Sequence, residues 1–280
     1  MTSEADRIAQ ISDPIELIKA ATARLNEAQQ EVTDLGRLRR RKIQELSEAG
    51  MSYAQIAEAA GLSRARIHQV RHSGPPVEGY FFGGGSIIVA TPLKQDAIQA
   101  RPVVAVEDVA AAQRLGELAQ ALGLGFQSEH VQPDGSIDLN RDGLVVISGP
   151  RISPAVASVL AQDDDLRFER APDGPWTLRD VRTGATYRSG WDNDPPEQFD
   201  FAYLGRLPRP DGAGTVLVFT GIHPPGSLGV VKLLTTKLSD LYERVKDRRF
   251  SVIVRTAYDK VTHEPGAVEL VTPFYEPGER

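Results

Sequence analysis

The chain has 280 residues, of which 41% are hydrophobic and 25% charged, and its formal net charge is −6. This composition is typical of a globular protein with one large or two modest domains, and it excludes wholesale disorder. No apolar run approaches the roughly 18–20 residues of a membrane-spanning helix, and the acidic N-terminus is unlike a secretory signal. The sequence contains no cysteine, which excludes disulfides and thiol nucleophiles and favours the cytoplasm.

A long helix is expected first. Asp13 can cap it, and Pro14 suits its first position. The helix should run to about Ala49 and end at Gly50. Apolar residues recur along it every seven positions, as Ile18, Leu25 and Val32 and again as Ala21, Ala28 and Leu35. This heptad pattern indicates a short coiled coil that pairs two chains into a homodimer or a higher homo-oligomer. The alternative is that the stripe packs against the C-terminal part of its own chain.

Positive charge is concentrated in residues 37–73. This stretch holds eight basic and three acidic residues, a net charge of +5, so the rest of the chain carries −11. A compact basic block in an acidic chain is typical of a nucleic-acid-binding module.

Two short helices around a tight turn are predicted within this block, over residues 53–72. Ser52 and Gln55 form a capping box at the first helix. Gly61 suits the left-handed conformation of the turn, and Ser63 caps the second helix. Ala57 is a small residue at the point where the two helices are expected to cross. Ile67 should fill the space between them, supported by Leu62 and Val70.

This spacing resembles the helix-turn-helix of bacterial transcriptional regulators and the promoter-reading region of sigma factors. The composition, rich in Arg, Ala, Gly and Pro, looks actinobacterial. The resemblance covers about 40 residues when the preceding helical stretch, residues 35–49, is counted as the first of three helices. The alternatives are a structural three-helix bundle and a relic module that now binds protein.

The resemblance implies that the second helix enters the major groove of double-stranded DNA with its N-terminus first. Arg suits guanine, Gln suits adenine, and an Ala methyl can touch thymine. The side chains expected at base edges are Ser63, Arg64, Ala65, His68 and Gln69. The remaining DNA contacts, mostly to phosphates, are assigned to Arg39, Arg40, Arg41, Lys42, Gln55, Arg66 and Arg71.

A linker over residues 74–79 separates this module, residues 1–73, from a second domain, residues 80–280. Its Gly and Pro residues cannot continue a helix. Beyond it, apolar strands at 86–90, 144–148, 215–219 and 250–254 alternate with helices at 107–122, after Ser153, and up to Val245. This alternation predicts an α/β fold, a mostly parallel Rossmann-like sheet, with a β-rich insertion over 166–188.

Two turns in this domain follow buried strands and precede helices. One contains Gly149 and Arg151, and the other contains Gly221, His223, Gly226 and Ser227. Helix N-termini at the carboxyl edge of a sheet favour anions, so a nucleotide-like or phosphorylated ligand is expected here. Pro150, Pro224 and Pro225 remove amides that a phosphate would need, and no dinucleotide or P-loop motif is present. The alternative is that both are ordinary strand-to-helix turns.

The order of domains resembles a one-component bacterial transcription factor, which implies a sensor or oligomerisation domain after the DNA-binding module. The function expected is therefore a sequence-specific, dimeric DNA-binding regulator. One alternative is a DNA-targeted enzyme acting on a nucleotide or nucleic acid, and another is an architectural DNA-binding scaffold. No catalytic residues, cofactor or metal ligands are assigned. A set of aromatic residues could stack a ligand base or simply pack, namely Trp176, Trp191, Phe199, Phe201 and Tyr203.

Overall fold

The computed structural model describes residues 4–96 and 101–277. The chain folds into two compact units. One comprises Met1–Gly79 together with Leu122–Leu124, and we call it the helical unit. The other comprises Tyr80–Ala121 and Gly125–Arg280, and we call it the α/β unit. No helix in the described part of the chain is long and apolar enough to cross a membrane.

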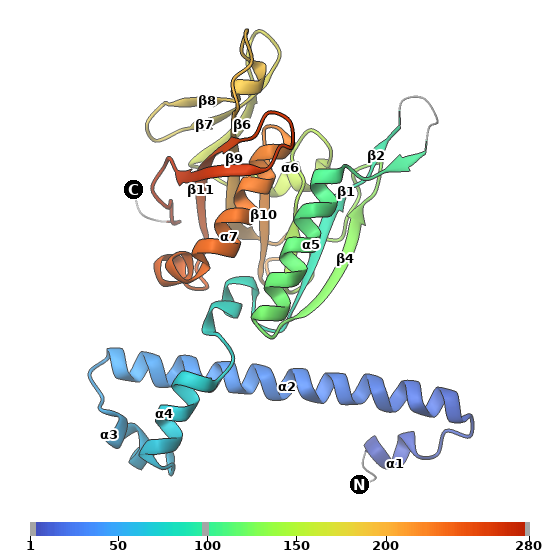
Figure 1. Ribbon diagram of the computed structural model, residues 1–280, viewed down its shortest axis with the longest axis vertical. Helices are drawn as coiled ribbons and strands as arrows, with labels where there is room; N and C mark the ends of the chain where they lie inside the picture. The colour runs from blue at the N-terminus through green and yellow to red at the C-terminus, as the bar shows by residue number, and fades with distance from the viewer. Residues whose placement is uncertain (1–3, 97–100, 278–280) are drawn as a thin grey trace. The chain divides into compact units, whose positions relative to one another are not determined.

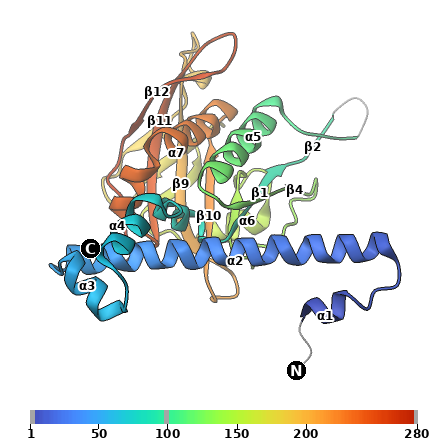
Figure 2. The ribbon, with the colours of Figure 1, turned by 60° about the horizontal axis from the view of Figure 1, so that its bottom comes forward.

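The helical unit is built on one long helix. Its helices are α1 (Glu4–Ile8), α2 (Pro14–Glu48), α3 (Tyr53–Ala60) and α4 (Arg64–Ser73), and α3 and α4 pack near the C-terminal end of α2 (Figure 2). The predicted start of α2 is confirmed, because the Asp13 carboxylate accepts hydrogen bonds from the amides of Ile15 (2.7 Å) and Glu16 (3.3 Å). Its predicted end is also confirmed, since Gly50 follows with φ +94°.

A small apolar core joins α2, α3 and α4. Ile43 from α2 packs with Ile56 and Ala57 of α3 and with Ile67 and Val70 of α4. The capping box of Ser52 and Gln55 is present, Gly61 has φ +65°, and Ser63 caps α4. One expectation was wrong. Leu62 is 37% exposed, because the turn holds it on the surface instead of between the helices.

The α/β unit contains a seven-stranded sheet in the order β12-β11-β9-β10-β5-β1-β4. The strands are β1 (Ser86–Pro92), β4 (Gly125–Val131), β5 (Leu144–Val146), β9 (Phe199–Pro208), β10 (Thr215–Gly221), β11 (Phe250–Tyr258) and β12 (Pro265–Leu270). Strands β4, β1, β5 and β10 are parallel, as expected from their apolar runs. Strand β9 pairs antiparallel with both β10 and β11, and β12 with β11, so five of the seven strands run in one direction.

Helices cover both faces of this sheet. Helices α5 (Val106–Ala121) and α7 (Pro224–Val245) contact each other on one face (Figure 1). Helix α6 (Pro154–Leu160) shares a core cluster with alternate residues of β9, Phe201 and Tyr203, and therefore lies on the other face.

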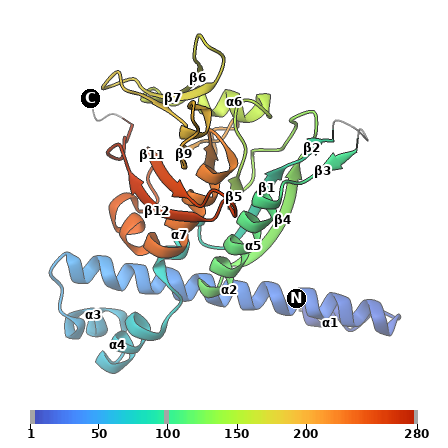
Figure 3. The ribbon, with the colours of Figure 1, turned by 45° about the horizontal axis from the view of Figure 1, so that its top comes forward.

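Smaller elements complete the unit. The predicted β-rich insertion is a three-stranded antiparallel sheet of β6 (Leu166–Arg170), β7 (Trp176–Asp180) and β8 (Thr186–Arg188). Strands β2 (Lys94–Gln95) and β3 (Pro102–Val103) pair beyond the end of β1 (Figure 3). Two 3₁₀ helices, η1 (Val77–Phe82) and η2 (Gly190–Asp192), precede β1 and β9.

Candidate functional sites

The outer face of α4 carries the side chains that the sequence assigned to base contacts. Arg64, Ala65, His68 and Gln69 are exposed, whereas Ile67 and Val70 are buried. The helix therefore separates an apolar inner face from a polar outer face. Ser63 is exposed as well, but its hydroxyl already accepts a hydrogen bond from the Arg66 amide at 3.1 Å.

Several cations of α4 contact neighbours on the same unit. Arg66 donates to the Oε1 atom of Gln69 at 2.6 Å, and the guanidinium of Arg71 lies 5.4 Å from the centre of the Tyr53 ring. Within the described residues, Arg64 has no hydrogen-bond or ion-pair partner. Arg64 is thus the arginine of α4 that could contact a partner molecule without first losing a contact within the chain.

The rings of His68 and His72 lie 4.3 Å apart on α4. Desolvation lowers the pKa of His72, and the nearby positive charges of His68, Arg71 and Arg40 lower it further. No group of three or more potential metal ligands is found among the described residues, and this pair has no third member there.

The basic run on α2 is less uniform than the sequence suggested. Arg39 is exposed, whereas Arg40 donates to the Gly74 carbonyl at 2.7 Å and so holds the segment that follows α4. Arg41 and Lys42 both contact Glu45, at 3.5 Å and 2.6 Å. Arg40 thus has a structural partner within the unit, which engages one of the five N–H donors of its guanidinium.

Gln55 also has a structural partner. Its Oε1 atom accepts hydrogen bonds from the amide (2.9 Å) and the hydroxyl (2.8 Å) of Ser52. The acceptor end of this side chain therefore serves the cap of α3, and only its NH₂ group could donate to DNA.

In the α/β unit, the two glycine-containing turns lie at the same edge of the sheet, since they follow the neighbouring parallel strands β5 and β10. A Cβ atom placed on Gly149 would lie 3.0 Å from the Thr220 hydroxyl. Residues of both turns, including Arg151 and Gly221, line a cavity of about 30 Å³. The turns are adjacent, as expected, but this cavity has room for about one water molecule and none for a nucleotide.

The start of α7 is occupied by a carboxylate of the chain itself. The Oδ2 atom of Asp200 accepts hydrogen bonds from the amides of His223 (2.8 Å) and Gly226 (3.0 Å). A Cβ atom at position 226 would lie 2.5 Å from that oxygen, so glycine is required here. The hydroxyl of Ser227 accepts from the Gly221 amide at 2.9 Å.

These contacts overturn the expected anion site at the helix starts. The amides of His223, Gly226 and Gly221 are engaged within the chain, and Ser153 in turn caps α6 by accepting from the Val156 amide at 3.2 Å. A helix N-terminus that is already capped has few unsatisfied amides for an external phosphate.

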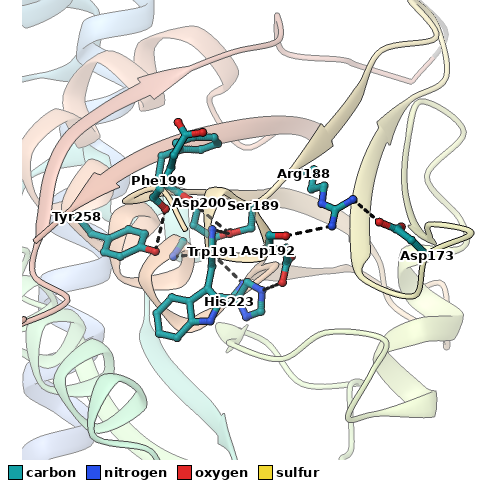
Figure 4. Close-up of polar contacts among 11 residues, drawn as sticks. Asp173, Arg188, Ser189, Trp191, Asp192, Phe199, Asp200, His223 and Tyr258 are labelled. Carbon is teal, nitrogen blue, oxygen red and sulfur yellow. Dashed lines mark hydrogen bonds and ion pairs between the residues drawn. The ribbon is translucent and has the colours of Figure 1, made fainter. Parts of the chain in front are cut away.

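Asp200 is itself unusual, because its carboxyl group is fully buried. Burial raises its pKa to about 7, although hydrogen bonds from the His223 amide and the Ser189 hydroxyl oppose the rise (Figure 4). Its second oxygen, Oδ1, has no hydrogen-bond partner in the described structure. Burial thus favours the protonated form of this carboxyl group over a wider range of pH than is usual for an aspartate.

An imidazole–carboxylate pair lies beside Asp200. The Nε2 atom of His223 is 3.0 Å from the Oδ1 atom of Asp192, and the indole of Trp191 stacks on the imidazole with ring centres 5.5 Å apart (Figure 4). Helix η2 holds Trp191 and Asp192 in place, since the Ser189 hydroxyl accepts from the Trp191 amide at 3.3 Å. Trp191 remains 40% exposed, so part of its ring is open to a ligand.

A second imidazole–carboxylate pair lies on the other side of Trp191. The Nδ1 atom of His263 is 3.2 Å from the Oε1 atom of Glu107, and its ring meets the indole edge-on at 5.2 Å. Burial opposes ionisation of Glu107, but its own backbone amide and His263 lower its pKa overall. We call these five residues, Glu107, Trp191, Asp192, His223 and His263, the Trp191 cluster.

The Trp191 cluster was only partly foreseen from the sequence. His223 and Trp191 were singled out, but for a different site and without their partners. The histidines and their carboxylates are separated by 31 and 156 positions, so no local motif could pair them. For two other aromatic candidates the packing alternative holds, because Phe201 and Tyr203 are buried in the core and Tyr203 donates to Asp163 at 2.8 Å.

Comparisons with protein-family models, with curated proteins and with solved structures return no match for this chain.

Proposed function

We propose that this chain is a sequence-specific DNA-binding protein, a dimeric one-component transcriptional regulator whose α/β unit senses a small ligand. The observation that carries the proposal is the outer face of α4, where Arg64, Ala65, His68 and Gln69 are all exposed. The inner face of the same helix packs in the apolar core of the helical unit. These are residue types that contact base edges in the major groove.

The electrostatics support the same function. The basic block holds a net charge of +5 in a chain of net charge −6, so attraction to phosphates would be confined to the helical unit. The acidic remainder would oppose non-specific binding elsewhere on the protein. Arg39 of α2 is exposed, and in this proposal it contacts a phosphate of the DNA.

Selection of bound duplexes from a random DNA pool, followed by fluorescence anisotropy with the full chain, tests this function. Arg64→Ala should weaken binding roughly 5- to 150-fold and relax the preference at one base pair. Arg39→Ala should weaken all sequences alike and reduce the salt dependence. Arg244→Ala removes an exposed arginine of α7 and serves as the matched control. A protein that enriches no sequence, or whose affinity is unchanged in Arg64→Ala, would contradict the proposal.

The Trp191 cluster supplies the sensor site in this proposal. The face of an indole ring stacks on planar ligands, and the two imidazoles can donate hydrogen bonds to an anionic group of the ligand. A nucleotide-like ligand meets both requirements, and this location replaces the helix starts. Titrating nucleotides into a Trp176→Phe chain leaves Trp191 as the only indole and should quench its fluorescence. Stabilisation against heat that persists in Trp191→Ala would place the ligand elsewhere.

The paired Asp192 and His223 also favour a second candidate, an enzyme that acts on a nucleotide or nucleic acid. A carboxylate that orients an imidazole is the usual arrangement of a general base. Turnover of a bound nucleotide that Asp192→Asn lowers at least tenfold, with binding retained, would establish this function in place of sensing. Binding without turnover would leave the sensor function.

A further inference from the structure

The apolar stripe of α2 faces solvent. Ile18, Leu25, Val32 and Leu35 are 58–69% exposed, although they are the large residues of the heptad pattern. Arg37, which lies on another face of α2, is fully buried and donates to the Pro76 carbonyl at 3.1 Å within the helical unit. The stripe is thus the side of α2 that the helical unit itself leaves open.

A parallel pair of α2 helices would use this stripe poorly. In a parallel coiled coil, equal positions face each other in each layer. Ala21 would then meet Ala21 and Ala28 would meet Ala28 of the second copy, while Leu25 would meet Leu25. Layers of two alanines leave space between helices whose other layers hold two large side chains, and such gaps weaken packing.

An antiparallel pair removes this mismatch. If facing residues are those whose numbers add to 53, Leu25 meets Ala28 of the second copy and Val32 meets Ala21. The end layers pair Ile18 with Leu35. Each alanine therefore faces a large residue, and the two-fold axis passes between residues 26 and 27. The stripe is complementary to itself in this register.

The flanking charges agree with the same register. Arg24 and Glu31 lie along one side of the stripe, and the antiparallel arrangement brings Arg24 beside Glu31 of the second copy twice in each dimer. Among the described residues, the one ion pair of Arg24 is with Glu27 of its own helix, at 3.5 Å. Both side chains of this pair are exposed. A parallel arrangement would leave Arg24 and Glu31 apart.

We propose that α2 pairs with α2 of a second copy in the antiparallel register in which Leu25 faces Ala28. This inference gives a geometry to the dimer assumed in the proposed function, and it depends on that dimer but not on DNA binding. It places the two DNA-binding modules at opposite ends of the paired helices, not side by side.

Disulfide formation in the full chain tests the register, because the sequence has no cysteine of its own. Ile18→Cys and Leu35→Cys chains should not crosslink when each is alone, since like positions lie about 26 Å apart in this register. An equimolar mixture of the two should form a mixed dimer on oxidation. Crosslinking of each variant by itself would instead establish the parallel pair and overturn the proposal.

Charge reversal gives an independent measurement by sedimentation equilibrium. Arg24→Glu should weaken dimerisation at least fivefold, and the double variant Arg24→Glu with Glu31→Arg should restore it. Lys19→Glu makes the same change of charge on α2, off the stripe, and should leave dimerisation unchanged. A full chain that is monomeric at high micromolar concentration would overturn the inference. DNA binding by that monomer, still sensitive to Arg64→Ala, would preserve the DNA-binding part of the proposed function.

Discussion

The two units of this molecule differ in where they place most of their charge. The helical unit keeps most of its cations on the outside of a core of only a few aliphatic residues, with the buried Arg37 as an exception. The α/β unit instead buries charged groups, among them Asp200 and Arg206. The guanidinium of Arg206 lies 4.9 Å and 5.3 Å from the ring centres of Phe81 and Phe250 and donates to three backbone carbonyls. Arg39 and Arg64 of the first unit are exposed, whereas Asp200 and Arg206 of the second unit are buried and hold the fold together through hydrogen bonds to the backbone.

Replacing one arginine in each unit tests whether buried charge contributes more to stability than exposed charge. Arg206→Met should destabilise the α/β unit by about 3–5 kcal/mol, because it leaves the carbonyls of Phe81 and Arg248 without donors. Arg39→Met should change stability by less than about 0.5 kcal/mol. In urea unfolding, tryptophan fluorescence reports the α/β unit, which contains both tryptophans, and circular dichroism at 222 nm reports the loss of helix in the helical unit. Equal losses in the two variants would show that the contrast between the units is false.

The small core of the helical unit allows a second comparison. Ile67 is fully buried between α2 and α3, so Ile67→Ala should cost about 2–5 kcal/mol. Leu62→Ala removes a side chain of similar size that is 37% exposed and should cost less than about 1 kcal/mol. Circular dichroism at 222 nm should detect the loss of helix in Ile67→Ala, while the fluorescence transition stays in place. A fluorescence transition that shifts with it would mean that the units unfold together.

The buried carboxyl group of Asp200 should make the stability of the α/β unit depend on pH. Because the folded-state pKa of Asp200 is raised to about 7, the folded protein holds a proton that the unfolded chain loses near pH 4. Its contribution is fully present below about pH 4 and is lost as the pH rises to 7. Asp200→Asn should therefore remove on the order of 2 kcal/mol of this pH dependence. Unfolding midpoints in urea at pH 5 and pH 8 measure it, and an unchanged difference between them would contradict the assignment.

The smallest effect expected is at a helix cap. Ser63→Ala should destabilise the helical unit by about 1 kcal/mol, because the Arg66 amide loses its acceptor. Ser63→Asp keeps an acceptor and should restore most of this stability, although its charge should weaken DNA binding. Circular dichroism measures the stability of both variants, and a Ser63→Ala chain as stable as the parent would mean that the cap contributes nothing.

The sequence predicts the helical unit better because its determinants are local. Asp13 contacts amides two and three residues away, and Ser52 and Gln55 cap each other across three positions. The α/β class, the parallel strands and the β-rich insertion were also foreseen, since apolar runs and turn residues mark them. Three strands of the large sheet, β4, β9 and β12, were missed. Strands β4 and β12 are mostly exposed, and the aromatic residues of β9 were considered for stacking on a ligand instead of as a strand.

The sites of the α/β unit depend on contacts over long separations in sequence. Arg206 donates to a carbonyl 125 positions away, and Tyr275 donates to Asp180 over 95 positions. Asp200 caps α7 from 23 positions upstream, so the turn at His223 gave no sign that its amide was taken. The residues of the Trp191 cluster come together only through the sheet, and a single sequence holds no periodic signal for such pairs.

The length of α2 has a mechanical consequence. The exposed stripe ends at Leu35, and the core of the three-helix module formed by α2, α3 and α4 begins at Ile43, so both lie on one uninterrupted helix. The helical phase between these residues thus sets the direction in which α4 points. One residue inserted between them would turn the module by about 100° around the α2 axis and advance it by about 1.5 Å. Seven inserted residues would return it to within about 20° of its original direction, some 10 Å further along the axis.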